Sequence, residues 1–236
     1  RALRFRFQHS MTTAQVQEQL ASPADPDAHR EMTRVGINVA KSYGIKTPVL
    51  RGIARQIGKD HSLALERWES GISDARHLEY MVDVPARIDE SQMEDWASDF
   101  DSWAVTDPAC FGLFRQTAFA YDKAVEWSER NEEFVKRGGF VLMAGLVVHD
   151  KRAPDGNFLK FFPIIDRESD DDRNFVKKAV NWALRSIGKR SIVLNQAAID
   201  TAGDIQKRGT RAARWIAADA IRELIGDKDQ ARLKKR

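Results

Sequence analysis

The stretch RNFVKKAVNWALRSIGKR, residues 173–190, indicates the fold class of this protein. Its apolar side chains recur at intervals of three or four residues, which places them on one face of a helix. They are Phe175, Val176, Ala179, Trp182, Ala183 and Ile187. Gly188 is expected to end the helix, because glycine accepts the backbone conformation in which many helices stop.

The stretch KTPVLRGIARQIGKD, residues 46–60, repeats this design. Thr47 is expected to cap the helix, Pro48 fits its first turn, and Gly58 should end it. Similar signals recur along almost the whole chain, whereas strand signals are almost absent. Further helices are expected over about 28–41, 63–71, 75–82, 90–99, 108–116, 120–130, 132–148, 158–165, 192–207 and 210–225. The joints are short, so consecutive helices should pack antiparallel in an all-α protein.

A faint internal repeat suggests how these helices are organised. FVKRGGFVL begins at Phe134, and FVKKAVNWAL begins at Phe175, 41 residues later. TRAARWIAADAIREL, which begins at Thr210, is a third version. A period near forty, with two helices per unit, is typical of HEAT-like solenoids, whose stacked helix pairs curve around a concave face. The alternative is ordinary helical packing with a chance similarity.

Composition excludes several classes of protein. The 236 residues contain one cysteine, Cys110, so no intrachain disulfide can form, and a reducing, cytoplasmic setting is expected. The five histidines are never spaced as in a helical zinc site, and we expect no metal. No apolar run approaches the length of a membrane span. Residues 1–10 resemble neither a signal peptide nor a folded element, so we expect an upstream extension there and one HEAT-like-repeat domain over 11–236.

Charge is distributed unevenly although the formal net charge is only +3. Residues 60–101 carry twelve acidic and three basic side chains, whereas residues 173–214 carry ten basic and two acidic ones. Such a basic block is expected for a protein that binds a polyanion. We expect the acidic segment on the convex outer face, because it would oppose binding of a polyanion in the cleft. The alternative is two solvated faces that partly neutralise each other.

The stretch DSWAVTDPACFGLF, residues 101–114, contains the main candidate for catalysis, Asp107. Trp103 precedes Asp107 by four residues, and Pro108 follows it directly. The structural alternative is strong, because Asp followed by Pro is a common helix beginning, in which the carboxylate accepts hydrogen bonds from backbone amides. Trp103 and Trp182 are likewise often core residues.

Basic side chains recur at equivalent places in the repeats. Arg137, Lys177 and Lys178 follow the apolar turn that enters each of two helices, so they should project from equivalent edges. With further residues of the basic block they could follow a phosphate backbone. These further residues are Arg185, Lys189, Arg190, Arg211 and Arg214. The alternative is solvated helix faces.

Four segments of the chain, in this order, resemble the AlkD-like DNA alkylation repair proteins, which are HEAT-like-repeat DNA glycosylases. The segments are YGIKTPVLRGIARQIGKDH, DSWAVTDPACFGLF, EEFVKRGGFVLM and DDDRNFVKKAVNWALRSIGKR. The resemblance extends from about Arg34 to Glu223. It implies a right-handed superhelical all-α solenoid of antiparallel helix pairs, HEAT-like or ARM-type, with a concave basic cleft for duplex DNA.

The resemblance also implies an activity and a site. Enzymes of this family hydrolyse the N-glycosidic bond of purines alkylated at ring nitrogen 3 or 7, such as 3-methyladenine and 7-methylguanine, without a metal or organic cofactor. Trp103 resembles the first cleft tryptophan, Asp107 the catalytic aspartate, Arg137 the cleft arginine and Trp182 the second tryptophan. The family holds the lesion near the base stack, so we expect no deep base pocket. We expect a bacterial cytoplasmic monomer that acts at the nucleoid and does not bind membranes.

The chemistry agrees with these residue types. A purine alkylated at a ring nitrogen is already cationic and leaves easily. An ionised Asp107 could stabilise the developing oxocarbenium and orient a water, while the indoles of Trp103 and Trp182 lie against the sugar. Arg137 would position the DNA backbone. No lysine stands out as a Schiff-base nucleophile, so the enzyme would be monofunctional.

Some positions depart from the family pattern. Ala104 stands where an acidic residue is common, Val35 and Gly36 lie where an aromatic can face the cleft, and Gly138 and Gly139 stand where alanines are usual. The two glycines should loosen their helix. The alternative function is therefore a non-catalytic helical-repeat module that binds DNA structures or a protein partner.

Overall fold

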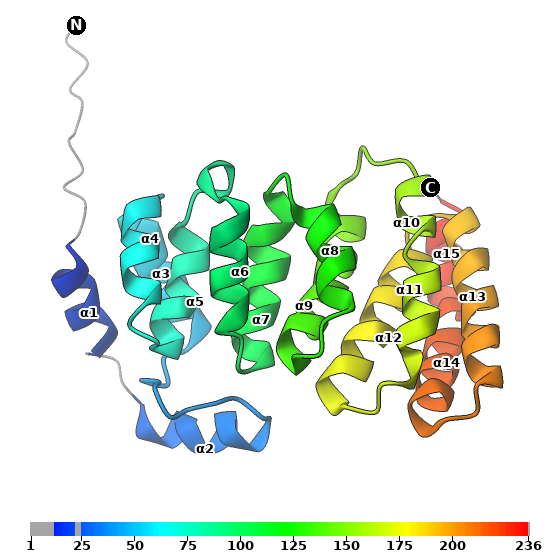
Figure 1. The fold of residues 1–236 in the computed structure, drawn as a ribbon, viewed down its shortest axis with the longest axis horizontal. Helices are drawn as coiled ribbons and strands as arrows, with labels where there is room; N and C mark the ends of the chain where they lie inside the picture. Colours follow the sequence, from blue (N-terminus) through cyan, green and yellow to red (C-terminus); the bar gives the residue numbers. More distant parts are fainter. Residues whose placement is uncertain (1–11, 22–24, 236) are drawn as a thin grey trace, which may run out of the picture. The chain divides into compact units, whose positions relative to one another are not determined.

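The computed structural model describes residues 12–21 and 25–235, which form helices joined by short connections (Figure 1). The expected upstream extension, residues 1–10, lies outside the described residues. Contacts divide the chain into two compact units, Arg1–Arg87 and Ile88–Arg236. All four expected catalytic residues belong to the second unit.

The helices of each unit are as follows. The first unit contains α1 (Thr13–Ala21), α2 (Pro26–Arg34), α3 (Thr47–Ile57), α4 (His61–Trp68), α5 (Ser73–Val82) and the 3-10 turn η1 (Pro85–Arg87). The second begins with α6 (Glu90–Ser98), α7 (Trp103–Pro108), the π-helical turn η2 (Ala109–Leu113) and the 3-10 turn η3 (Phe114–Gln116). It continues with α8 (Ala120–Ser128), α9 (Glu133–His149), α10 (Gly156–Leu159), α11 (Phe162–Arg167), η4 (Glu168–Asp170), α12 (Asn174–Gly188), α13 (Ile192–Lys207), α14 (Arg211–Leu224) and α15 (Asp227–Leu233).

The all-helical prediction is confirmed, and most differences concern helix ends. The helix predicted over 158–165 is divided into α10 and α11, and the one predicted over 108–116 consists of the turns η2 and η3 after α7. The helix predicted over 192–207 has those bounds in the structure. The helix predicted over 28–41 ends at Arg34, because Gly36 takes a positive φ of 79° and turns the chain. Thr47 is the first residue of α3 rather than its cap, and it makes no capping hydrogen bond. The sequence reading missed α1 and α15, which are short.

The internal repeat corresponds to real structural units. Helices α9 and α12 begin 41 residues apart in the sequence and pack against each other, and α14 packs against α12 (Figure 1). The first aromatic residues of the two FVK segments, Phe134 and Phe175, are in contact, with ring centroids 5.4 Å apart. The repeat in the sequence therefore marks equivalent helices of neighbouring repeats.

Two glycines prove to be packing residues. A Cβ at Gly139 of α9 would lie 2.5 Å from the backbone nitrogen of Ser128 and 3.0 Å from the carbonyl oxygen of Ala124, both in α8. Gly188, predicted as a helix stop, is the last residue of α12, where a Cβ would come within 2.7 Å of Leu224. Both glycines let neighbouring helices approach more closely than alanine would allow.

The acidic segment, residues 60–101, is not a single solvated face. Three of its carboxylates are buried in the first unit and hold the chain together there. Asp74 accepts hydrogen bonds from the Tyr43 and Ile45 amides and the Ser42 hydroxyl, Glu79 pairs with Arg67, and Asp83 pairs with His61. Burial raises the pKa of Glu79 to about 8, although Arg67 opposes this shift. Three of the twelve acidic residues of this segment therefore serve the packing of the first unit.

Candidate functional site

One continuous helical stretch presents the residues around Asp107. Helix α7, the π turn η2 and the 3-10 turn η3 follow one another without a break from Trp103 to Gln116. The helix begins after Ser102, so Asp107 lies inside it, and the interpretation of Asp107 as a helix cap is wrong. Pro108 has no amide hydrogen for the α-helical ladder, and the backbone widens into the π turn directly after it. Such turns often occur at functional sites.

Asp107 is paired with Arg137 of α9 in a two-pronged ion pair. Arg137 Nε donates to Asp107 Oδ1 and Arg137 Nη2 donates to Asp107 Oδ2, each over 2.7 Å. Arg137 Nη1 donates to the carbonyl oxygen of Phe175 on α12, also over 2.7 Å. The side chains of Arg137 and Asp107 are only 8% and 18% exposed. Arg137 therefore joins three elements and holds the carboxylate in a fixed orientation.

Burial and the ion pair have opposite effects on Asp107. Burial is the larger effect and raises the pKa of Asp107, while the hydrogen bonds and charge of Arg137 lower it. Because a guanidinium stays charged, the pair favours the ionised form of Asp107 against the effect of burial. Burial raises the pKa of the neighbouring Cys110 thiol well above its usual range, and the charge of Asp107 adds to this shift. Cys110 is therefore an apolar core residue.

Trp182 reaches the same helical stretch from α12. Its ring stacks on Phe111, with centroids 5.4 Å apart and an angle of 19° between the planes. Phe111 in turn makes a T-shaped contact with His149, with centroids 5.1 Å apart. Trp103 begins α7 one turn before Asp107 and is half-buried. Sequence reasoning missed Phe111, although its position four residues after Asp107 places it on the same helix face.

The residues expected to bind DNA fall into two groups, of which the first is accessible. Lys178, Arg211 and Arg214 are exposed on α12 and α14. Lys177 is half-buried, with its ammonium 5.9 Å from the centroid of the Trp215 ring. Lys178, Arg211 and Arg214 can therefore meet an anion from solvent, whereas the Lys177 side chain is only 16% exposed and its ammonium lies 3.4 Å from Asp172 Oδ1.

The second group is engaged within the protein. Arg185 and Lys189 both pair with Glu223 of α14. Arg190 donates to the carbonyl oxygens of Val147 and Asp150 over 2.8 Å and to that of Ala153 over 2.6 Å. The expectation that Arg190 contacts phosphate is therefore not supported, because its guanidinium fixes the connection after α9.

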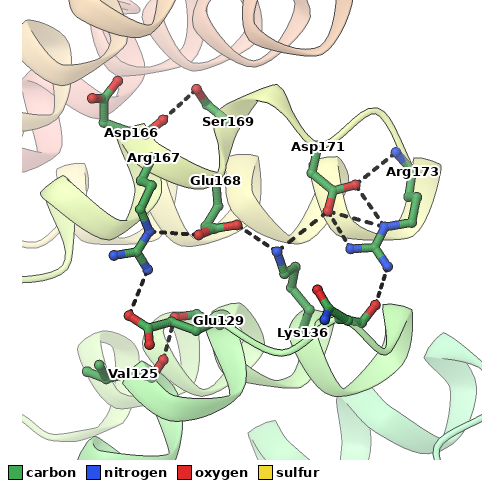
Figure 2. A network of polar contacts seen from close by, with 11 residues as sticks. Val125, Glu129, Lys136, Asp166, Arg167, Glu168, Ser169, Asp171 and Arg173 are labelled. Carbon is green, nitrogen blue, oxygen red and sulfur yellow. Dashed lines mark hydrogen bonds and ion pairs between the residues drawn. The ribbon is translucent and has the colours of Figure 1, made fainter.

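Lys136, next to Arg137, belongs to a separate network of charges that links α8 and α9 to the segment before α12 (Figure 2). Its ammonium lies 2.6 Å from Glu168 Oε2 and 3.8 Å from Asp171 Oδ2. Arg167 bonds the same Glu168 and reaches Glu129. Burial alone would raise the pKa of Glu168, but the bonds from Lys136 and Arg167 outweigh it and lower that pKa. The network stabilises the packing of neighbouring repeats. Lys136 is engaged in this network, and Arg137 is the cation that pairs with Asp107.

The fold and the site together define a HEAT-like repeat protein with a buried aspartate and arginine beside an aromatic pair. The model of the DNA alkylation repair enzyme family matches residues 16–224, and the chain belongs to this family. No curated protein matches the sequence. None of the described helices is long and apolar enough to cross a membrane.

A solved structure has the same fold over nearly the whole chain. It represents a family of proteins related to the HEAT-like repeat DNA glycosylases, with affinity for branched DNA structures. The similarity has a TM-score of 0.77 and covers 94% of this chain and 96% of that chain, at 17% sequence identity. At this identity the similarity concerns the fold.

Proposed function

We propose that the protein is a monofunctional DNA glycosylase. It hydrolyses the N-glycosidic bond of cationic purines alkylated at ring nitrogen 3 or 7 in duplex DNA. The observation that carries this proposal is the largely buried Asp107, which accepts two hydrogen bonds from Arg137 of α9. The helical stretch that contains Asp107 also contains Phe111, whose ring stacks on Trp182. Membership of the DNA alkylation repair enzyme family supports it.

The reaction requires little proton transfer, because the alkylated purine is already positively charged and leaves as a neutral base. The transition state instead places positive charge on the sugar. An ionised carboxylate with a fixed orientation stabilises that charge without reorganising during the reaction. Each oxygen of Asp107 accepts one hydrogen bond from Arg137 and keeps further acceptor capacity, so it can also orient the attacking water.

The aromatic residues contribute a surface for the sugar. The indole of Trp182 is fixed by its stack on Phe111, and the indole of Trp103 lies one turn before Asp107. Their faces attract a cationic transition state. Arg137 acts through Asp107 as a positioning residue, because two of its N–H groups donate to the carboxylate and a third donates to the carbonyl oxygen of Phe175.

The deciding experiment measures release of free methylated purine from methylated duplex DNA without added metal. Wild-type protein should release 7-methylguanine or 3-methyladenine, whereas Asp107→Asn should bind the same DNA and release no base above background. The asparagine keeps the size of the side chain and removes its charge. Release by neither protein, with retained DNA binding, would contradict the glycosylase proposal.

A non-catalytic module that binds DNA structures is the second candidate. The observation that favours it is the fold shared with a protein whose family has affinity for branched DNA structures. Such a module would use the exposed cations of α12 and α14 and would not need Asp107. It would bind a branched junction more tightly than a linear duplex, and Asp107→Asn would leave both affinities unchanged.

A further inference from the structure

The helical stretch that contains Asp107 also contains Arg115, a cationic residue that has no role in the proposed function. Trp103, Asp107, Phe111 and Arg115 follow at intervals of four residues, which keeps them on one side of the helix. The π turn has more residues per turn than an α-helix, so this spacing stays in line through η2. Arg115 lies eight residues after Asp107, about two helical turns further along the same stretch.

The contacts of Arg115 leave the outer part of its guanidinium available. Arg115 Nε donates to the carbonyl oxygen of Phe111 over 2.5 Å, which fixes the direction of the side chain. Its stem lies over α9, where a Cβ at Gly145 would be 3.3 Å from Arg115 Cδ. Within 12–21 and 25–235, no carboxylate forms an ion pair with Arg115, and no acceptor meets its two terminal nitrogens. Other buried or half-buried guanidiniums of the second unit, such as Arg137, have such partners.

A second basic side chain lies beside Arg115 at the end of α9. His149 makes a T-shaped contact with Phe111 and is exposed. Burial lowers its pKa, and the charges of Arg115 and Lys151 lower it further, so positive groups gather here. The next residue in the sequence is Asp150, whose carboxylate accepts a hydrogen bond from the Tyr121 hydroxyl and forms no ion pair with Arg115 in the described structure.

We propose that Arg115 and His149 form a binding subsite for one backbone phosphate of the DNA strand whose sugar lies against Trp182. The subsite rests on the proposed function in two respects: its ligand is DNA, and a sugar of the same strand lies against Trp182. A guanidinium with a fixed direction and two free terminal nitrogens matches two phosphate oxygens. The aromatic series from Trp182 through Phe111 to His149 connects it to the sugar surface. Because Arg115 lies about two turns from Asp107, the subsite would hold a phosphate outside the reacting nucleotide.

The test measures binding of an undamaged duplex over a range of salt concentrations. Each phosphate contact that is lost makes the slope of log binding constant against log salt less steep by about 0.9. Arg115→Gln should show this loss, so its affinity between 50 and 200 mM salt should fall about 3.5-fold less than that of the wild type. Arg115→Lys keeps the charge but cannot reproduce the fork, so it should retain most of the slope. Arg232→Gln, which removes an exposed charge on α15, is the matched control and should keep the wild-type slope.

The outcomes separate this subsite from the glycosylase proposal. If Arg115→Gln and Arg232→Gln have the same slope while the wild type binds DNA, the subsite is wrong. If Arg115→Lys has the same reduced slope as Arg115→Gln although it keeps the positive charge, the reduced slope does not report a lost phosphate contact, and the subsite is also wrong. If the wild type binds DNA but releases no base, only the glycosylase proposal is contradicted. A reduced slope for Arg115→Gln would then still support the subsite. Absence of DNA binding by the wild type overturns both.

Discussion

At the scale of single residues, Asp107 depends on a partner 30 positions away in the sequence. Its carboxylate is buried, and an unpaired buried charge would be neutralised by a proton. Arg137 opposes this by donating to both oxygens, and a third N–H of its guanidinium donates to the carbonyl oxygen of Phe175. The position of the carboxylate is therefore coupled to the packing of α9 against α12.

The raised pKa of Asp107 predicts a pH dependence of base release. The reaction requires the ionised carboxylate, so the rate should be constant at neutral pH and fall as the pH drops through the pKa of Asp107. Because burial raises that pKa, the fall should begin at higher pH than for an ordinary aspartate. Single-turnover rates on DNA with 7-methylguanine, measured with saturating protein, would show this. A rate that rises as the pH falls would mean that a protonated group does the catalysis instead.

At the scale of helices, Gly139 determines how closely α8 and α9 pack. The atoms that a Cβ would meet belong to the backbone of α8, which cannot rotate away as a side chain could. The sequence alone suggested that Gly138 and Gly139 loosen the helix, since glycine is a poor helix former. The packing reverses this interpretation for Gly139, because the helix–helix contact requires a residue without a side chain.

Gly139→Ala is therefore expected to destabilise the protein by about 1–3 kcal/mol, the usual effect of overpacking. The matched control is Gly203→Ala in α13, where nothing lies within 4 Å of the new Cβ. Gly203→Ala should stabilise the protein by about 0.5–1 kcal/mol, because alanine is the better helix former. Urea unfolding followed by circular dichroism would give both values. Equal effects of the two substitutions would contradict the packing role of Gly139.

At the scale of the whole molecule, the small net charge of +3 does not show that the basic side chains are of two kinds. Some are bonded to groups of the protein, and others face solvent. Arg185, Lys189 and Arg190 hold helices and connections together, whereas Lys178 and Arg211 face solvent. Affinity for DNA should depend on the second group and stability on the first. Position in the basic block of the sequence does not distinguish them.

A pair of substitutions with the same charge change tests this distinction. Arg211→Gln should leave the midpoint of thermal unfolding unchanged and reduce the salt slope of duplex binding by about 0.9. Arg190→Gln should lower the midpoint, because three carbonyl oxygens lose their charged donor. The folded fraction of Arg190→Gln should bind duplex DNA with the same salt slope as the wild type. Differential scanning fluorimetry and fluorescence anisotropy at several salt concentrations measure the two properties. A lower midpoint for Arg211→Gln alone would reverse the assignment.

Local sequence determined much of this protein, because helix periodicity and capping act between residues a few positions apart. Such signals predicted the all-α class, the bounds of α13 and the repeat that relates α9 to α12. The four segments that resemble the AlkD-like proteins indicated the family and singled out Asp107 and Trp182. The expected phosphate role of Arg190 is not supported, because its partners lie 37 to 43 positions away in the sequence.

The tertiary structure decided which residues meet. Only the packing of α7 and α9 brings Asp107 and Arg137 together, and only the approach of α12 places Trp182 on Phe111. The same packing left the outer nitrogens of Arg115 without an acceptor in the described structure. Periodicity tells which face of a helix is apolar, but hydrogen bonding and charge pairing depend on distances between atoms of different helices. Those distances are determined by how all the side chains of the core fill space together.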